Sequence, residues 1–192
     1  MKIRHALTGI AAGALLFVGA GAADATTQSQ AQVQVHAVAA GPTITTNFFL
    51  NSSGLCLDAD TGTLHAKSTK VQLWTCNGQV QQLWVFHVAP GNPSAWVITN
   101  TGGDNKCLDA DTGTINHNGT IVHLYPCDNN AVQQWYLEQD SNGNLYLQSA
   151  AAAASGKYLD AASERAGQNG DPVQLWAWNG GGASQRWSMI TS

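Results

Sequence analysis

Short runs of the chain alternate apolar with polar or aromatic residues, a pattern that predicts β-strands. One run is Val71-Gln72-Leu73-Trp74, and matching runs lie at 122–125 and 173–176. Alternate side chains of a strand share a face, so Val71 and Leu73 are expected to point into a core. Gln72 and Trp74 are expected on the opposite, outer face. Asn-Gly pairs between the runs are turn signals, and no helical period is sustained. The pattern therefore predicts an all-β protein.

The same residue types return at a fixed interval, which indicates three equivalent units. Each unit has Leu-Asp after a Cys or Tyr, then an aromatic residue followed two positions later by Cys or Trp, and ends in Gln-x-Trp. At intervals of 51 these positions hold Cys56, Cys107 and Tyr158; Trp74, Tyr125 and Trp176; and Cys76, Cys127 and Trp178. The Gln-x-Trp triplets lie at 82–84, 133–135 and 185–187. By strand alternation Leu57 is expected inside, with Cys56 and Asp58 on the outer face.

The first 25 residues have the features of a secretory signal peptide. A basic start precedes an apolar run from Ala6 to about Ala20, and Ala23-Asp24-Ala25 is a candidate cleavage site, with residues 20–22 as the competing one. The run is short of the roughly 20 residues that a membrane span needs, which disfavours an uncleaved anchor. We expect a secreted protein without membrane insertion, with a flexible polar leader at 26–44 and one folded domain at 45–192.

Composition narrows the possible partners. Only 10% of the 192 residues are charged, against roughly 25% in an average soluble protein. The formal net charge is -4, whereas nucleic-acid binding requires clustered Lys and Arg. No nucleic-acid partner is therefore expected.

The four cysteines indicate two disulfides in a secreted chain. Four cysteines allow three pairings, and the repeat selects the symmetric one, Cys56–Cys76 and Cys107–Cys127. A zinc site is the rival interpretation, but a gap of 20 residues lacks the close spacing of zinc ligands. In the third unit Tyr158 and Trp178 occupy the cysteine positions, so an aromatic contact is expected in place of the bridge.

These motifs resemble the ricin-type lectin repeat, a family also called carbohydrate-binding module family 13. The resemblance covers about residues 45–192 and implies a β-trefoil of three pseudo-repeats of about 51 residues. In this fold six strands form a short barrel and six form a cap of hairpins. The tryptophans of the Gln-x-Trp triplets, Trp84, Trp135 and Trp187, are interpreted as structural core.

A sugar offers C–H groups to an aromatic plane and hydroxyls to a carboxylate or an amide. Each unit has such a set on its expected outer face: Asp58, Gln72 and Trp74; Asp109, His123 and Tyr125; Asp160, Gln174 and Trp176. The resemblance implies that each Asp accepts from sugar hydroxyls, that each aromatic residue stacks on the ring, and that the triplet glutamines, Gln82, Gln133 and Gln185, support the Asp. The family has Asn immediately before each triplet, where this chain has Gln81, Val132 and Ser184. By residue types the first site is the most complete, then the third, then the second.

Other chemistries fit less well. Asp58 to Gly62 and Asp109 to Gly113 resemble the start of a calcium loop, but the twelfth position is Thr rather than Glu; Asp60 and Asp111 are instead expected to cap turns. A glycosidase needs a pair of carboxylates across a cleft, whereas the Asp residues here recur threefold as binding residues do. The sequence thus predicts a non-catalytic, monomeric lectin without metal or cofactor that binds glycans or polysaccharides, of galactose type or like xylan. A trefoil protease inhibitor acting through one exposed loop is the alternative.

Overall fold

The computed structural model describes residues 43–50, 53–162 and 167–191. The predicted signal peptide and nearly all of the predicted leader lie outside these residues. The first strand begins at Ile44, the last residue assigned to the leader by the sequence. Among the described residues, no helix is long and apolar enough to cross a membrane.

The described chain is built of β-strands joined by turns and four short 3₁₀ segments. The strands are β1 (Ile44–Leu50), β2 (Leu55–Ala59), β3 (Thr69–Trp74), β4 (Trp84–Ala89), β5 (Asn92–Asn100), β6 (Cys107–Ala110), β7 (Thr120–Tyr125), β8 (Gln134–Gln139), β9 (Leu145–Ser149), β10 (Lys157–Ala161), β11 (Val173–Ala177) and β12 (Trp187–Thr191). The 3₁₀ segments are η1 (Val80–Gln82), η2 (Ala131–Gln133), η3 (Ala152–Ala154) and η4 (Ala183–Gln185). The predicted all-β class is confirmed.

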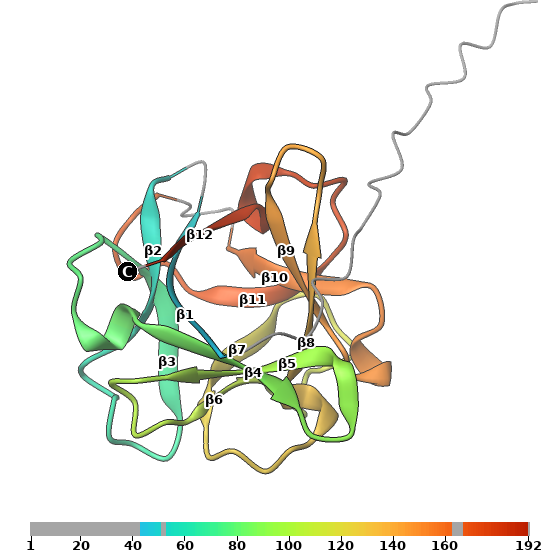
Figure 1. The fold of residues 1–192 in the computed structure, drawn as a ribbon, viewed down its shortest axis with the longest axis horizontal. Coiled ribbons are helices and arrows are strands. Elements are labelled where there is room, and N and C mark those ends of the chain that lie inside the picture. The colour runs from blue at the N-terminus through green and yellow to red at the C-terminus, as the bar shows by residue number, and fades with distance from the viewer. Residues whose placement is uncertain (1–42, 51–52, 163–166, 192) are drawn as a thin grey trace, which may run out of the picture. The chain divides into compact units, whose positions relative to one another are not determined.

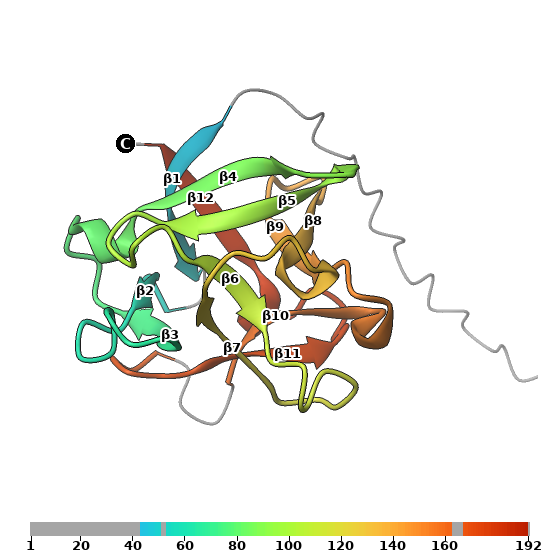
Figure 2. The ribbon, with the colours of Figure 1, turned by 90° about the horizontal axis from the view of Figure 1, so that it is seen from below.

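Six of the strands close into a barrel. The antiparallel pairs β1–β4, β4–β5, β5–β8, β8–β9, β9–β12 and β12–β1 form a complete ring. A closed ring leaves no unpaired edge. Figure 1 shows the arrangement of the strands from one end, and in Figure 2 the barrel strands β4 and β5 lie above the hairpin strands.

The other six strands form three hairpins, β2–β3, β6–β7 and β10–β11, one from each unit. Their second strands meet one another, since β7 pairs with both β3 and β11 and a single bridge joins Gln72 of β3 to Pro172. Barrel and hairpin cap together are the β-trefoil that the family resemblance implied.

Three tryptophans tie the hairpin cap to the barrel. Trp84, Trp135 and Trp187 each begin or nearly begin a barrel strand and are 0% exposed, where the sequence placed them. Their indole Nε1 atoms donate to the carbonyl oxygens of Leu57, Leu108 and Leu159 at 3.0, 3.0 and 3.1 Å. Those three carbonyls belong to the first strand of each hairpin, so every unit repeats the same connection between its two halves.

Both predicted disulfides are confirmed. Cys56–Cys76 and Cys107–Cys127 each join Cα atoms 5.1 Å apart. In the third unit the rings of Tyr158 and Trp178 lie 4.7 Å apart between centroids, and Tyr146 meets Trp178 edge-on at 5.0 Å. An aromatic cluster thus occupies the place of the missing bridge, as the sequence indicated.

The side chains on the outer face of the hairpins differ from one another in their exposure to solvent. Val71, Leu73 and Leu57 point into the core as expected, but Cys56, Asp58 and Gln72 are also buried, at 1%, 3% and 4% exposure. Strand alternation gives the correct face for these side chains, but it does not show that the segment containing η1 contacts β2 over that face. The outer face is therefore open at Trp74 and covered at Asp58.

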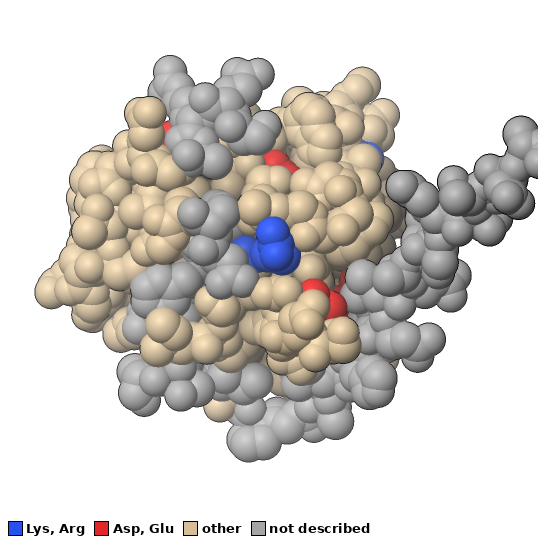
Figure 3. Space-filling model, turned by 90° about the horizontal axis from the view of Figure 1, so that it is seen from above, with Lys and Arg blue, Asp and Glu red and all other residues tan. Residues whose placement is uncertain are grey.

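The low charge of the sequence is visible on the surface. Figure 3 shows a face on which most of the described atoms belong to uncharged residues, with few Lys, Arg, Asp or Glu. Recognition on such a surface depends on hydrogen bonds and apolar contacts more than on a strong electrostatic field.

Candidate carbohydrate-binding sites

The first site is organised around the carboxylate of Asp58. Asp58 lies directly opposite Gln72 in the β2–β3 hairpin. Its Oδ1 accepts from Gln72 Nε2 at 3.2 Å, and its Oδ2 accepts from Gln82 Nε2 at 2.9 Å. Burial raises the pKa of the Asp58 carboxyl above its usual value, while the hydrogen bonds from Gln72 and Gln82 counter part of that rise. The carboxylate is thus fixed in one orientation before any ligand arrives.

The second site keeps this plan with His123 in place of the glutamine. Asp109 Oδ2 accepts from Gln133 Nε2 at 2.8 Å, and Asp109 Oδ1 lies 3.0 Å from His123 Nε2. His123 stacks on Tyr125 with 5.7 Å between ring centroids, and its Nδ1 lies 2.9 Å from the hydroxyl of Ser68. The imidazole is therefore held from both of its nitrogens and braces the aromatic ring.

The third site uses a different pair of donors. Asp160 Oδ1 accepts from Gln174 Nε2 at 3.2 Å, and Asp160 Oδ2 accepts from the hydroxyl of Ser184 at 2.9 Å. Gln185 Nε2 donates to the backbone oxygens of Trp176 and Ala177 at 3.3 and 3.0 Å. Burial raises the pKa of the Asp160 carboxyl, and its hydrogen bonds partly oppose that effect. Ser184, which stands where the family has Asn, thus orients the acid directly.

The glutamine of each triplet also makes a second contact that the sequence analysis missed. The side-chain oxygens of Gln82, Gln133 and Gln185 accept from the backbone N–H groups of Asn77, Asp128 and Asn179 at 2.8, 2.9 and 3.1 Å. These three residues are 51 apart, so the repeat spacing could have pointed to them. The contact holds the loop after each hairpin against the site.

An aromatic side chain borders each carboxylate and stays partly open to solvent. Trp74 and Trp176 are 38% and 41% exposed, and Tyr125 has intermediate exposure. Each lies two positions after the glutamine or histidine that contacts the Asp, hence on the same side of its strand. The structure therefore brings together the Asp, amide or imidazole, and aromatic residue in all three units.

The other two residues at the family's Asn position differ from Ser184. Gln81 is 8% exposed, and its side chain adds a hydrogen bond that lowers the pKa of the Asp58 carboxyl. Val132 packs against the core and cannot hydrogen-bond through its side chain. Two of the three substitutions therefore keep a polar contact with the site's carboxylate.

A cavity of about 350 Å³ lies at the second site. Its lining residues are Asp109, Asp111, Thr112, His123, Tyr125, Asp128, Asn130 and Val132. Thr112, Asp128 and Asn130 were not predicted as site residues from the sequence, because the surrounding loops bring them to the cavity. Asp111, expected to cap a turn, accepts from the Thr114 hydroxyl at 2.9 Å; Asp60 accepts likewise from Thr63 at 2.9 Å. The cavity belongs to the unit that residue types alone ranked last.

Each site is also bordered by a loop from another unit. Lys67 Nζ lies 5.1 Å from the ring centroid of Tyr125 in the second site. The equivalent residue Asn118 accepts from the Ala177 N–H at 2.9 Å beside the third site, and Asn169 accepts from the Thr75 N–H at 2.7 Å beside the first. These contacts cross between units and were not predicted from the sequence, although positions 67, 118 and 169 are 51 apart. At this position the second site has a cation, whereas the other two sites have a neutral amide.

Among the described residues, no group of three His, Cys, Asp or Glu side chains is arranged to hold a metal ion.

Models of two known protein families match the chain. The model of the ricin-type β-trefoil lectin domain matches residues 94–192, and a second model, of the ricin-type β-trefoil lectin domain-like family, matches residues 37–125. The chain belongs to the ricin-type β-trefoil lectin family. Its fold is that of a carbohydrate-binding lectin, with the three units of the family present. A search of curated protein sequences finds no match.

Solved structures share the ricin-type fold at low sequence identity. The designed threefold-symmetric protein ThreeFoil is 21% identical with a TM-score of 0.66, covering 77% of this chain and 99% of its own. An exo-β-1,3-galactanase from Clostridium thermocellum is 21% identical with a TM-score of 0.67, covering 78% of this chain but 30% of its own. The ricin B-like lectin of Macrolepiota procera, solved in complex with lactose, is 16% identical with a TM-score of 0.61, covering 77% of this chain and 95% of its own. The ricin-type trefoil thus occurs both alone and as part of a larger enzyme.

Proposed function

We propose that the protein is a secreted, non-catalytic lectin that binds galactose-type sugars or a polysaccharide such as xylan through up to three shallow sites. The observation that carries this proposal is the repeated geometry of the sites. In every unit a buried Asp carboxylate, fixed by side-chain donors on both oxygens, lies beside an aromatic ring that solvent reaches.

The arrangement suits a sugar for two physical reasons. A carboxylate oxygen has more than one lone pair, so the Asp oxygens keep acceptor capacity for sugar hydroxyls after binding their protein donors. The open aromatic face supplies apolar contact for the C–H side of the ring. Because the donors fix the carboxylate beforehand, little side-chain entropy is lost on binding.

Two lectin structures that share the fold support a galactose-type ligand. The Macrolepiota procera lectin is complexed with lactose, and a Polyporus squamosus lectin with a TM-score of 0.62 is bound to an epitope containing sialylated galactose. Both are only 16% identical to this chain, so they guide the choice of sugars for a test.

Lack of catalysis is part of the same proposal. The Asp and aromatic set recurs in three units, as expected for binding sites, whereas a glycosidase concentrates one pair of carboxylates at one cleft. The cavity at the second site is lined by three Asp residues. A test for glycoside hydrolysis should therefore examine this site first. We expect no release of reducing sugar from any polysaccharide that the protein binds.

This proposal can be tested by measuring the binding of the purified protein to a panel of glycans and insoluble polysaccharides that includes galactosides and xylan. Saturable binding, competed by free galactose, lactose or a xylan fragment, is the expected result and names the ligand class. A folded protein with both disulfides formed that binds nothing on the panel would contradict the proposal. A protease-inhibition assay would then test the alternative role through an exposed loop.

A further inference from the structure

A second kind of cavity lies in the hairpin cap, where the three units meet. It has a volume of about 420 Å³, within the range of small-molecule sites. Its lining residues come from all three units: Thr63, Ser68, Lys70, Val71, Gly119, Ile121, Val122, His123, Pro172, Val173 and Gln174. Only His123 also lines the cavity of the second sugar site. We call this space the cap cavity.

Equivalent positions of the repeat build its walls. Val71, Val122 and Val173 are 51 apart and almost completely buried. One residue earlier in each unit the chain has Lys70, Ile121 and Pro172. The valines belong to the buried core beneath the cavity, whereas the preceding position is exposed in every unit and differs between the units.

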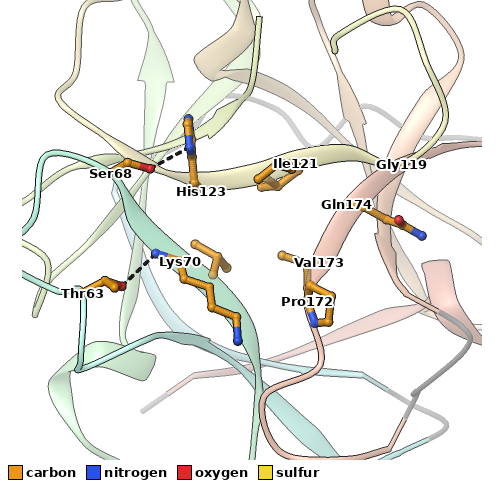
Figure 4. A pocket seen from close by; sticks show the side chains of 11 residues that line it. Thr63, Ser68, Lys70, Gly119, Ile121, His123, Pro172, Val173 and Gln174 are labelled. Atoms are coloured by element: carbon orange, nitrogen blue, oxygen red, sulfur yellow. Dashed lines mark hydrogen bonds between the residues drawn. The ribbon is translucent and has the colours of Figure 1, made fainter. Parts of the chain in front are cut away.

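This difference makes the cap cavity asymmetric. Ile121 is 58% exposed, although an aliphatic side chain at that position gains nothing from facing water. Figure 4 shows Ile121, Pro172 and Val173 around the cavity, with Lys70 extending along the wall of its own strand. At this position one wall therefore carries a cation and the other two carry apolar side chains.

The cation has no carboxylate partner among the described residues that line the cavity. Lys70 Nζ donates to the Gly170 carbonyl at 3.0 Å, which leaves further N–H groups of the ammonium available. None of the described lining residues is Asp or Glu. The hydroxyl of Ser68 and the imidazole of His123 lie on the same polar side of the cavity as Lys70, with 2.9 Å between Ser68 Oγ and His123 Nδ1. A ligand that meets both sides must combine an apolar body with a negative charge.

We propose that the cap cavity binds a small organic anion with an apolar, ring-containing body. The apolar body contacts Ile121 and Pro172, and the anionic group pairs with Lys70. This goes beyond the proposed lectin function, since the ligand is of a different chemical class and the cavity shares only His123 and Gln174 with the proposed sugar sites.

The first test titrates the purified protein with 8-anilinonaphthalene-1-sulfonate, an apolar aromatic anion, and follows its fluorescence. We expect saturable binding of one dye per chain, weakened about tenfold or more by Ile121→Asp, which removes apolar contact and adds a like charge. Val80→Asp is the matched control, because Val80 is 55% exposed and outside the cap cavity. Its dye binding is expected to stay at the wild-type value.

The second test separates the charge from the apolar contact. N-Phenyl-1-naphthylamine has the same rings without the sulfonate. Lys70→Gln is expected to weaken the sulfonated dye about threefold or more, as an exposed ion pair permits, and to leave the neutral dye unchanged. Lys70 is exposed, so this variant should fold even if Ile121→Asp does not. Absence of dye binding, equal loss in Ile121→Asp and Val80→Asp, or equal effects of Lys70→Gln on both dyes would overturn the proposal.

Discussion

At the scale of single residues, the site carboxylates combine burial with a fixed set of donors. Asp58 and Asp160 are each 3% exposed and accept hydrogen bonds on both oxygens. Burial disfavours the charged form, and the donors favour it. The pKa of both carboxyls is raised, so burial is the stronger effect.

The raised pKa values of the Asp58 and Asp160 carboxyls predict how sugar binding depends on pH. Protonation of Asp58 and Asp160 begins above the ordinary value of 3.8 and removes the negative acceptor. Affinity at the first and third sites should therefore fall on acidification before an ordinary Asp would titrate. Titration calorimetry between pH 7 and pH 4 would measure this. An affinity that stays constant through that range would contradict a role for these carboxylates.

The same raised pKa values predict an opposite trend in stability. The folded chain binds these two protons more tightly than the unfolded chain does, so their contribution to the free energy of unfolding rises as pH falls through the interval above 3.8. Replacing both Asp residues by Asn should remove this contribution. Comparing denaturant unfolding of wild type and variant across that interval checks the sign.

The buried tryptophans are expected to act on stability alone. Trp135→Ala removes a 0% exposed ring and its hydrogen bond to Leu108, and should lower the free energy of unfolding by roughly 3–5 kcal/mol. Trp176→Ala, which truncates a 41% exposed ring, is the matched control and should cost much less. Denaturant unfolding of both variants decides this. Similar losses in the two would show that the core assignment is wrong.

At the scale of structural elements, two units close their hairpin with a disulfide and the third closes it with aromatic contacts. Disulfides of 20-residue separation close the first two units, each contributing around 3 kcal/mol on a chain-entropy estimate. The third unit has Tyr158, Trp178 and Tyr146 in ring contact instead. Tyr158 also donates to Glu138 at 3.0 Å, which anchors the cluster to β8.

The aromatic cluster should therefore contribute measurably to stability. Trp178→Ala breaks two ring contacts and is expected to cost about 1–3 kcal/mol, since each aromatic pair is worth roughly 0.5–1.5 kcal/mol. The loss should persist when both disulfides are reduced, because the cluster contains no cysteine. Thermal unfolding with and without reductant would show it. An unchanged midpoint in Trp178→Ala would mean that the cluster does not replace a bridge.

The elements also show what a sequence can and cannot reveal. Period-two alternation predicted the strands and the 51-residue repeat predicted the disulfides, because these depend on local pattern and symmetry. The hairpin cap and the core tryptophans came from the family resemblance. The covering of Asp58 by the segment containing η1 and the approach of Lys67 to Tyr125 depend on how loops pack across units. The hydrogen bond from Ser184 to Asp160 likewise requires the loop geometry.

At the scale of the whole molecule, the closed barrel and hairpin cap present the three proposed sugar sites on one trefoil. A shallow site facing water gives weak affinity for a single sugar, because ordering the ligand and desolvating its hydroxyls offset much of the contact energy. Several sites on one body raise the effective concentration for clustered or polymeric glycans. Binding should accordingly be much tighter to a polysaccharide than to the monosaccharide that competes for it.

The central claim is that the Asp and aromatic sets bind sugar. The most direct test compares wild type with the combined variant Trp74→Ala, Tyr125→Ala and Trp176→Ala on one immobilised glycan from the panel. All three rings are at least partly exposed, so the variant should fold, as circular dichroism and disulfide content can verify. We expect it to lose saturable glycan binding. A folded variant that binds the glycan as tightly as wild type would contradict the account.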